Sequence, residues 1–140
     1  MPVLFHLQEY PGFTIKKMNT IRNWIFDTIY EENKTPGTIN YIFCDDDYLL
    51  DLNRRYLQHD YFTDVITFSF VDEDIVSGDI YISVDRIKDN SMTYSASFTN
   101  ELHRVMIHGV LHLLGYDDKN ESENSLMKEK EDYFLNKLDF

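Results

Sequence analysis

The residues with the clearest chemical potential lie near the C-terminal end of the chain, where two histidines precede a glycine and two aspartates. His108 and His112 are four positions apart. In a helix this is about 400° of rotation, so both imidazoles lie on one face, roughly one turn apart, and can bind one tetrahedral metal ion. Gly115 suits the left-handed position that ends helices, so the chain can reverse there and bring Asp117 or Asp118 back towards the histidines. The spacing therefore predicts a metal site made of two histidines and one carboxylate.

The residues around the two histidines support this interpretation. They are apolar on all sides: Val105, Met106, Ile107, Val110, Leu111, Leu113 and Leu114. A helix that is apolar all round is buried, and burying two histidines without a partner is costly. Three protein ligands leave a fourth position for water, whose pKa zinc lowers to about 7. We therefore predict a metal-dependent hydrolase, and the alternative is a metal-free core in which the histidines are hydrogen-bonded.

The neighbours of His108 bear on which bond is hydrolysed. The spacing H-x3-H-x2-G-x2-D resembles that of the metzincin zinc peptidases, which carry a glutamate after the first histidine as general base. Here that position is Gly109, which cannot accept a proton, so a zinc peptidase is only a remote alternative. Arg104 lies on the same helical stripe one turn before His108, where it can contact a phosphate or pair with a carboxylate. His103 is about 140° away from His108 and is predicted to lie on the surface.

Composition limits the class of protein and its partners. With 140 residues the chain has the size of one domain, and we assign residues 1–140 to it. The formal net charge is -12, whereas proteins that coat nucleic acids are usually basic, so RNA binding would need a local basic patch and no DNA partner is expected. The longest apolar stretch, within 105–114, is too short to cross a bilayer, and the N-terminus lacks a signal peptide pattern. With a single cysteine, Cys44, predicted to be buried, the chain is expected to be cytoplasmic and not to bind membranes.

The order of predicted elements indicates an α+β fold: a small mixed β-sheet with helices packed on it, and the metal site on a buried central helix. Periodicity and turn residues predict strands at 3–7 (an edge strand), 39–43, 64–70 and 78–84, with 71–77 as a hairpin link, and helices at 15–32, 49–57, from about 85, at 99–114 and at 121–138. Three local features are also predicted: a turn at Thr35-Pro36-Gly37, an N-terminal cap at Asp45-Asp46-Asp47, and Thr99 as N-cap of the central helix. In the last helix, Leu126, Tyr133, Phe134 and Leu138 are predicted to face inward.

The segment from His108 to Asp118 is similar to the H-G-x-L-H-L-x-G-[YF]-D-H signature of the YbeY family, bacterial endoribonucleases of rRNA maturation. Three other blocks resemble the same family in the same order: residues 51–70, 78–83 and 127–131, the last as an M-x-x-x-E tail. The match covers roughly residues 39–135. The resemblance implies a single α+β domain with one Zn²⁺ and a single-strand-specific endoribonuclease activity. It also implies action on ribosomal RNA precursors and in ribosome quality control, and association with the small ribosomal subunit.

The resemblance also assigns site residues, with two departures from the family pattern. It places the third metal ligand at Asp118, so the predicted ligands are His108, His112 and Asp118; the family usually has histidine there, and the added negative charge should make the bound water less acidic and favour harder ions. The family's active-site arginine aligns with Leu57. Nearby Arg54, Arg55 and His59 are therefore the candidates for substrate binding, and Arg55 and Arg104 for stabilising charge during catalysis. The missing arginine and the -12 charge keep an alternative open, a ribosome-maturation factor with a structural metal and little nuclease activity.

Overall fold

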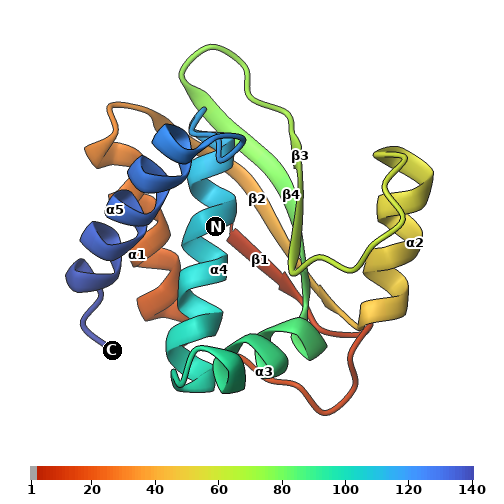
Figure 1. Cartoon of the computed structure of the whole chain (residues 1–140). Helices are drawn as coiled ribbons and strands as arrows, with labels where there is room; N and C mark the ends of the chain where they lie inside the picture. Colours follow the sequence, from red (N-terminus) through yellow and green to blue (C-terminus); the bar gives the residue numbers. More distant parts are fainter. Residues whose placement is uncertain (1–2) are drawn as a thin grey trace.

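The computed structural model describes residues 3–140 and contains a four-stranded mixed β-sheet. Its strands, in spatial order, are β1 (Val3–His6), β2 (Thr35–Cys44), β4 (Ile75–Ser83) and β3 (Val65–Ser69). The first three run parallel, and β3 pairs antiparallel with β4 as the predicted hairpin (Figure 1). β1 lies at one edge of the sheet, as predicted, and β3 at the other. The α+β prediction is therefore confirmed.

Five helices cover the sheet unequally: α1 (Met18–Glu31), α2 (Asp46–Tyr56), α3 (Val84–Thr93), α4 (Phe98–Leu113) and α5 (Glu121–Lys137). α1 and α4 pack on one face, and α5 packs against the outer side of α4 (Figure 1). α2 lies on the opposite face, where Leu49 contacts Cys44 and Ile66 in a small separate apolar cluster. α4 is thus enclosed between the sheet and other helices, which makes it the buried central helix that its sequence predicted. No helix in the described part of the chain has the length and hydrophobicity of a membrane span.

α4 crosses the sheet at very short range because two glycines lie at the crossing. A Cβ atom built on Gly109 would lie 2.7 Å from Cγ2 of Ile80 in β4, and one built on Gly78 would lie 2.7 Å from Cδ2 of Leu113. Each glycine therefore receives a branched side chain of the other element. It follows that position 109 faces β4, while the neighbouring His108 leaves the helix about 100° away from that direction.

Two local predictions on turns and caps were wrong, and one was confirmed. Thr35-Pro36-Gly37 is not a turn but the start of β2, because β4 begins at Ile75 and offers hydrogen-bonding partners to this segment; a bulge follows Pro36. The N-cap of α4 is Ser97, whose hydroxyl accepts a hydrogen bond from the Asn100 amide, and not Thr99. Asp45 caps α2 as predicted, accepting from the Tyr48 amide.

The burial of two helices differs from the apolar pattern of their sequences. In α5, Leu126 and Tyr133 are each 44% exposed, so their predicted inward orientation was wrong. The buried stripe is Met127, Glu131 and Phe134, and its central acidic residue hid it from an apolar pattern. His103 was predicted on the surface but is buried, since its ring packs edge-to-face against Trp24 of α1 and Phe140. Cys44 is buried as predicted.

Candidate metal site

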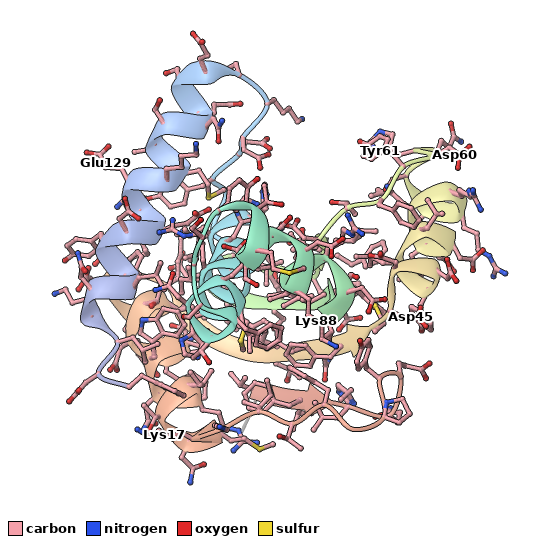
Figure 2. All side chains as sticks on the ribbon, turned by 60° about the horizontal axis from the view of Figure 1, so that its bottom comes forward. Lys17, Asp45, Asp60, Tyr61, Lys88 and Glu129 are labelled. Atoms are coloured by element: carbon pink, nitrogen blue, oxygen red, sulfur yellow. The ribbon has the colours of Figure 1, made fainter. Side chains whose placement is uncertain are left out.

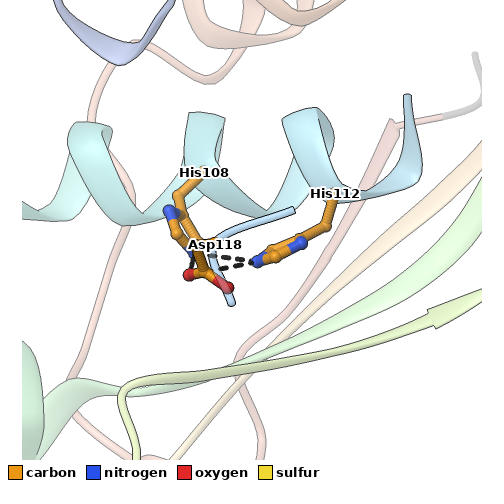
Figure 3. Close-up of side chains that lie close together, drawn as sticks. All are labelled: His108, His112 and Asp118. Carbon is orange, nitrogen blue, oxygen red and sulfur yellow. Dashed lines mark hydrogen bonds and ion pairs between the residues drawn. The ribbon is translucent and has the colours of Figure 1, made fainter. Parts of the chain in front are cut away.

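The end of α4 brings two imidazoles and one carboxylate to a common point. Gly115 has φ 103° and ends the helix as predicted, with the Tyr116 amide bonded to the Leu111 carbonyl in a Schellman arrangement. The reversed chain carries Asp118 back, so that its Oδ2 lies 3.4 Å from Nε2 of His108 and 3.7 Å from Nε2 of His112 (Figure 3). Among residues 3–140, this is the group of three potential ligands whose donor atoms all lie within 4.8 Å of one another.

The other candidate carboxylate points elsewhere. Oδ2 of Asp117 lies 3.7 Å from Nζ of Lys119, and in the described residues no hydrogen bond or ion pair joins Asp117 to either histidine. The geometry therefore brings together the three ligands predicted with the help of the motif, and it leaves Asp117 outside.

Each imidazole is fixed through its Nδ1 atom. His108 Nδ1 lies 2.6 Å from Oε2 of Glu131, and His112 Nδ1 lies 3.0 Å from the carbonyl oxygen of Tyr116. An ionised carboxylate and a backbone carbonyl can only accept, so both Nδ1 atoms carry the hydrogen and, in the neutral rings, both Nε2 atoms carry a lone pair. These Nε2 atoms are 3.0 Å apart and both face Asp118.

Three electron-rich atoms at such short range repel one another unless a proton or a metal ion lies among them. Two nitrogens bound to one tetrahedral zinc ion, at about 2.0–2.1 Å each, are about 3.3 Å apart, close to the spacing observed. Two imidazole nitrogens and one carboxylate oxygen are also a donor set that zinc accepts. The residues present therefore fit a single divalent metal ion with a fourth position left to the cleft.

The surroundings shift the pKa values of the two histidines in opposite directions. Burial alone would lower the pKa of His108, but the hydrogen bond and negative charge of Glu131 outweigh it, and the pKa is raised. Burial and the charge of His108 lower the pKa of His112. Protonation of His108 thus disfavours protonation of His112, so the pair holds at most about one positive charge among its acidic neighbours. A bound metal ion can replace that charge.

An open cleft of about 740 Å³ lies beside the donor atoms. Two lining residues, Arg104 and Lys128, are basic. Five are acidic: Asp64, Glu101, Asp118, Glu131 and Asp132. Burial raises the pKa of the half-buried Asp64, and burial together with the nearby Asp64 raises the pKa of Glu101. The cleft has room for part of a polymeric substrate. Because its charged lining is mostly acidic, a phosphate group can bind there only if a cation offsets the negative charge.

Arg104 lies on the ligand stripe, as its spacing predicted, and pairs with carboxylates. Its Nη1 donates to Oε1 of Glu131 at 2.9 Å and its Nη2 to Oδ1 of Asp132 at 2.7 Å. Of the two partners considered for this arginine, phosphate or carboxylate, the structure contains the second.

The other candidate substrate residues do not line the cleft. Arg54 and Arg55 end α2 on the opposite face of the sheet, and they pair with Asp60 and, within the helix, with Asp51. His59 follows α2 and stacks on Tyr61, with ring centroids 5.1 Å apart. Figure 2 shows Asp60 and Tyr61 at the outer end of α2, away from α5.

Three groups at the site were not predicted as functional: the Glu131 carboxylate, the Tyr116 carbonyl and the Asp64 carboxylate. Glu131 was visible only as the last residue of the M-x-x-x-E resemblance, and Asp64 only within a longer matched block. The Tyr116 carbonyl gave no signal, because a backbone acceptor leaves no trace in residue type.

Fold and site define an α+β protein with a candidate metal centre on its central helix, and comparisons with known proteins agree. The family model for Endoribonuclease YbeY matches residues 7–139. Endoribonuclease YbeY of Flavobacterium psychrophilum is 50% identical over 120 residues, which are 86% of this chain and 86% of that protein. Endoribonuclease YbeY of Bacteroides thetaiotaomicron is 48% identical over 135 residues, 96% of this chain and 98% of that protein.

A solved structure is similar as well. The solution structure of TM1509 from Thermotoga maritima superposes with a TM-score of 0.67 at 26% identity, covering 99% of this chain and 89% of that one. The chain belongs to the Endoribonuclease YbeY family, which confirms the family predicted from the sequence blocks.

Proposed function

We propose that this protein is a zinc-dependent endoribonuclease that cleaves single-stranded RNA during maturation of ribosomal RNA. The observation that carries the proposal is the set of three donor atoms on His108, His112 and Asp118 that face one another at 3.0, 3.4 and 3.7 Å. Zinc, when bound, supplies Lewis acidity and lowers the pKa of water, which is the chemistry that phosphodiester hydrolysis needs. Relatives at 48–50% identity bear the name Endoribonuclease YbeY, which supports RNA as the substrate class.

The residues of the chain divide the remaining work. The two histidines and Asp118 hold the ion at the wall of the cleft, and the lone-pair orientation of each imidazole is set before the ion arrives. A preformed site loses little entropy when it binds the ion or the substrate. Asp64 lines the same cleft with a pKa raised by burial, so it holds a proton more readily than a surface aspartate does.

The packing of Gly109 argues against the peptidase alternative. The side chain of a glutamate at this position would point towards Ile80, where even its Cβ atom would lie only 2.7 Å from Cγ2 of Ile80. No general base of the metzincin kind can stand at this position without moving α4 from the sheet.

RNA must approach a cleft that is itself acidic. We propose that the metal ion and Lys128 offset the charge within it.

Outside the cleft, Arg54, Arg55 and His59 form a separate exposed group. Tyr61, which is 57% exposed and stacks on His59, presents an aromatic ring there for stacking of an unpaired base. On this view an Arg54→Ala, Arg55→Ala variant binds RNA more weakly but cleaves saturating RNA at the rate of the parent.

We further propose that the small ribosomal subunit is the partner, that the same activity serves ribosome quality control, and that the protein acts in the cytoplasm, where ribosomes are assembled. Sedimentation of the purified protein with isolated small subunits, at several salt concentrations, tests the association. Failure to sediment with them at low salt would count against the partner but not against the nuclease.

The decisive test of the function compares two neighbouring aspartates. Folded Asp118→Ala protein should lose cleavage of a fluorescently labelled single-stranded RNA, whereas Asp117→Ala should cleave like the parent, because Asp117 pairs with Lys119 and not with the histidines. Chelation should abolish the parent's activity and added zinc should restore it. If Asp118→Ala cleaves as fast as the parent, the proposed function is wrong.

A second candidate is a ribosome-maturation factor whose metal is structural. Leu57 at the family's arginine position and the net charge of -12 favour it. Zinc bound at one ion per chain, with no cleavage of any single-stranded RNA, would favour this candidate over the nuclease.

A further inference from the structure

One buried carboxylate connects the metal site to the outer helix. Glu131 of α5 is 5% exposed, and each of its oxygens has its own partner on α4. Oε2 lies 2.6 Å from Nδ1 of His108, and Oε1 lies 2.9 Å from Nη1 of Arg104. Arg104 and His108 are one helical turn apart, so a single carboxylate spans two successive turns.

The position of Glu131 is set by the packing of α5 on α4. Met127 and Phe134, both fully buried, lie one turn on either side of it in the stripe that faces α4. A buried carboxylate is costly unless charge and hydrogen bonds compensate it, and here Arg104 supplies the charge and His108 a second donor. Neither oxygen is therefore free to turn to another partner.

We propose that Glu131 is a positioning residue for the metal site, with Arg104 as its counter-charge. By accepting from Nδ1, Glu131 holds the hydrogen of His108 on that side of the ring and leaves the Nε2 lone pair directed at His112 and Asp118. The proposal rests on the metal site of the proposed function, and it does not depend on RNA being the substrate.

The two imidazoles differ in how they are held. His112 Nδ1 donates to a backbone carbonyl, that of Tyr116, which no side-chain substitution removes. Among the Nδ1 contacts of residues 3–140, the one made by His108 is therefore to a side chain, and substitution of Glu131 can test it. Removing such a partner of a metal-bound histidine typically lowers metal affinity by about 10–100-fold.

The experiment measures zinc affinity directly, by competition with a chromophoric chelator, on the full chain. Glu131→Ala should bind zinc about 10–100-fold more weakly than the parent. Glu131→Gln, whose amide oxygen can still accept from Nδ1, should retain part of this affinity. Asp132→Asn is the matched control: it contacts Arg104 on the exposed side without touching His108, so its zinc affinity should stay within about twofold of the parent's.

A second readout separates positioning from general stability. Cobalt(II) in place of zinc gives visible absorption bands that report ligand geometry, and these should change in Glu131→Ala while they stay unchanged in Asp132→Asn. If Glu131→Ala does not fold, Glu131→Gln carries the same comparison.

The outcomes distinguish this proposal from the proposed function. A parent that binds zinc tightly, beside Glu131 variants with unchanged affinity and cobalt spectra, would overturn the role of Glu131 alone. A parent that binds no zinc would overturn both. Weaker zinc binding with altered cobalt spectra in the Glu131 variants would establish the positioning role whether or not the protein cleaves RNA.

Discussion

Replacing Gly109 by alanine probes the contact that sets α4 against the sheet. The new Cβ would lie 2.7 Å from Cγ2 of Ile80, 3.1 Å from its Cδ1 and 3.4 Å from its Cγ1, whereas carbon atoms attract best at about 3.5–4.0 Å. Ile80 is fully buried in a strand paired on both sides, so it has little room to withdraw. Overpacking of this kind costs about 1–3 kcal/mol. Alanine in place of glycine inside a helix gains about 1 kcal/mol, so Gly109→Ala should lower the free energy of unfolding by up to about 2 kcal/mol.

A double-mutant cycle measured by urea denaturation isolates the contact. Ile80→Ala removes all three contacting atoms and by itself costs about 2–5 kcal/mol. In that background Gly109→Ala should stabilise by about 1 kcal/mol, which is the helix propensity alone. Asn100→Ala, exposed on the same helix, is the control and should show the same effect in both backgrounds, within about 0.5 kcal/mol. Equal effects of Gly109→Ala with and without the Ile80 side chain would show that the contact with Ile80 does not limit the residue at position 109.

Three further predictions follow from local contacts. Burial raises the pKa of the Cys44 thiol to about 12, so iodoacetamide at pH 8 should modify native protein far more slowly than urea-unfolded protein; equal rates would contradict the buried placement. Burial lowers the pKa of His103, so its neutral form is preferred in the fold. Stability from this residue is complete above the ordinary histidine pKa of about 6.5 and is lost as pH falls through the lowered pKa, because the unfolded chain binds the proton first. His103→Gln should therefore lose less stability than the parent between pH 8 and pH 5, as read by urea midpoints, and a parallel pH dependence would disprove this. Asp45→Ala removes the acceptor of the Tyr48 amide and should lower the free energy of unfolding by about 1 kcal/mol. Asp47→Ala, which leaves this cap in place, should lower it by less.

The sequence predicted the parts of the site that depend on one helix and its end. His108 and His112 follow from a spacing of four, and Gly115 follows from the backbone that a helix end requires. The choice of Asp118 over Asp117 came from the resemblance to a family motif, because both residues lie close enough after the turn. Only the three-dimensional path of the chain shows that one carboxylate faces the imidazoles and the other pairs with Lys119.

What depends on contacts between distant elements was not predictable from pattern. Glu131 lies between the apolar Met127 and Phe134 of its stripe, but a carboxylate gives no apolar signal, and its burial depends on pairing with two residues of α4. His103 looked like a surface residue because nothing local reveals that Trp24 and Phe140 cover it. The turn predicted at Thr35-Pro36-Gly37 was wrong for the same reason: turn-forming residues entered a strand because a partner strand was available.

Metal content shows whether His108, His112 and Asp118 bind one metal ion. Native mass spectrometry on untagged protein, purified without chelator, should find one zinc ion per chain in the parent and in Asp117→Ala. The ion should be lost or strongly depleted in His112→Ala and Asp118→Ala that remain folded. Zinc retained at full stoichiometry in both of these variants, or absent from the parent, would show that these three residues do not form a zinc site.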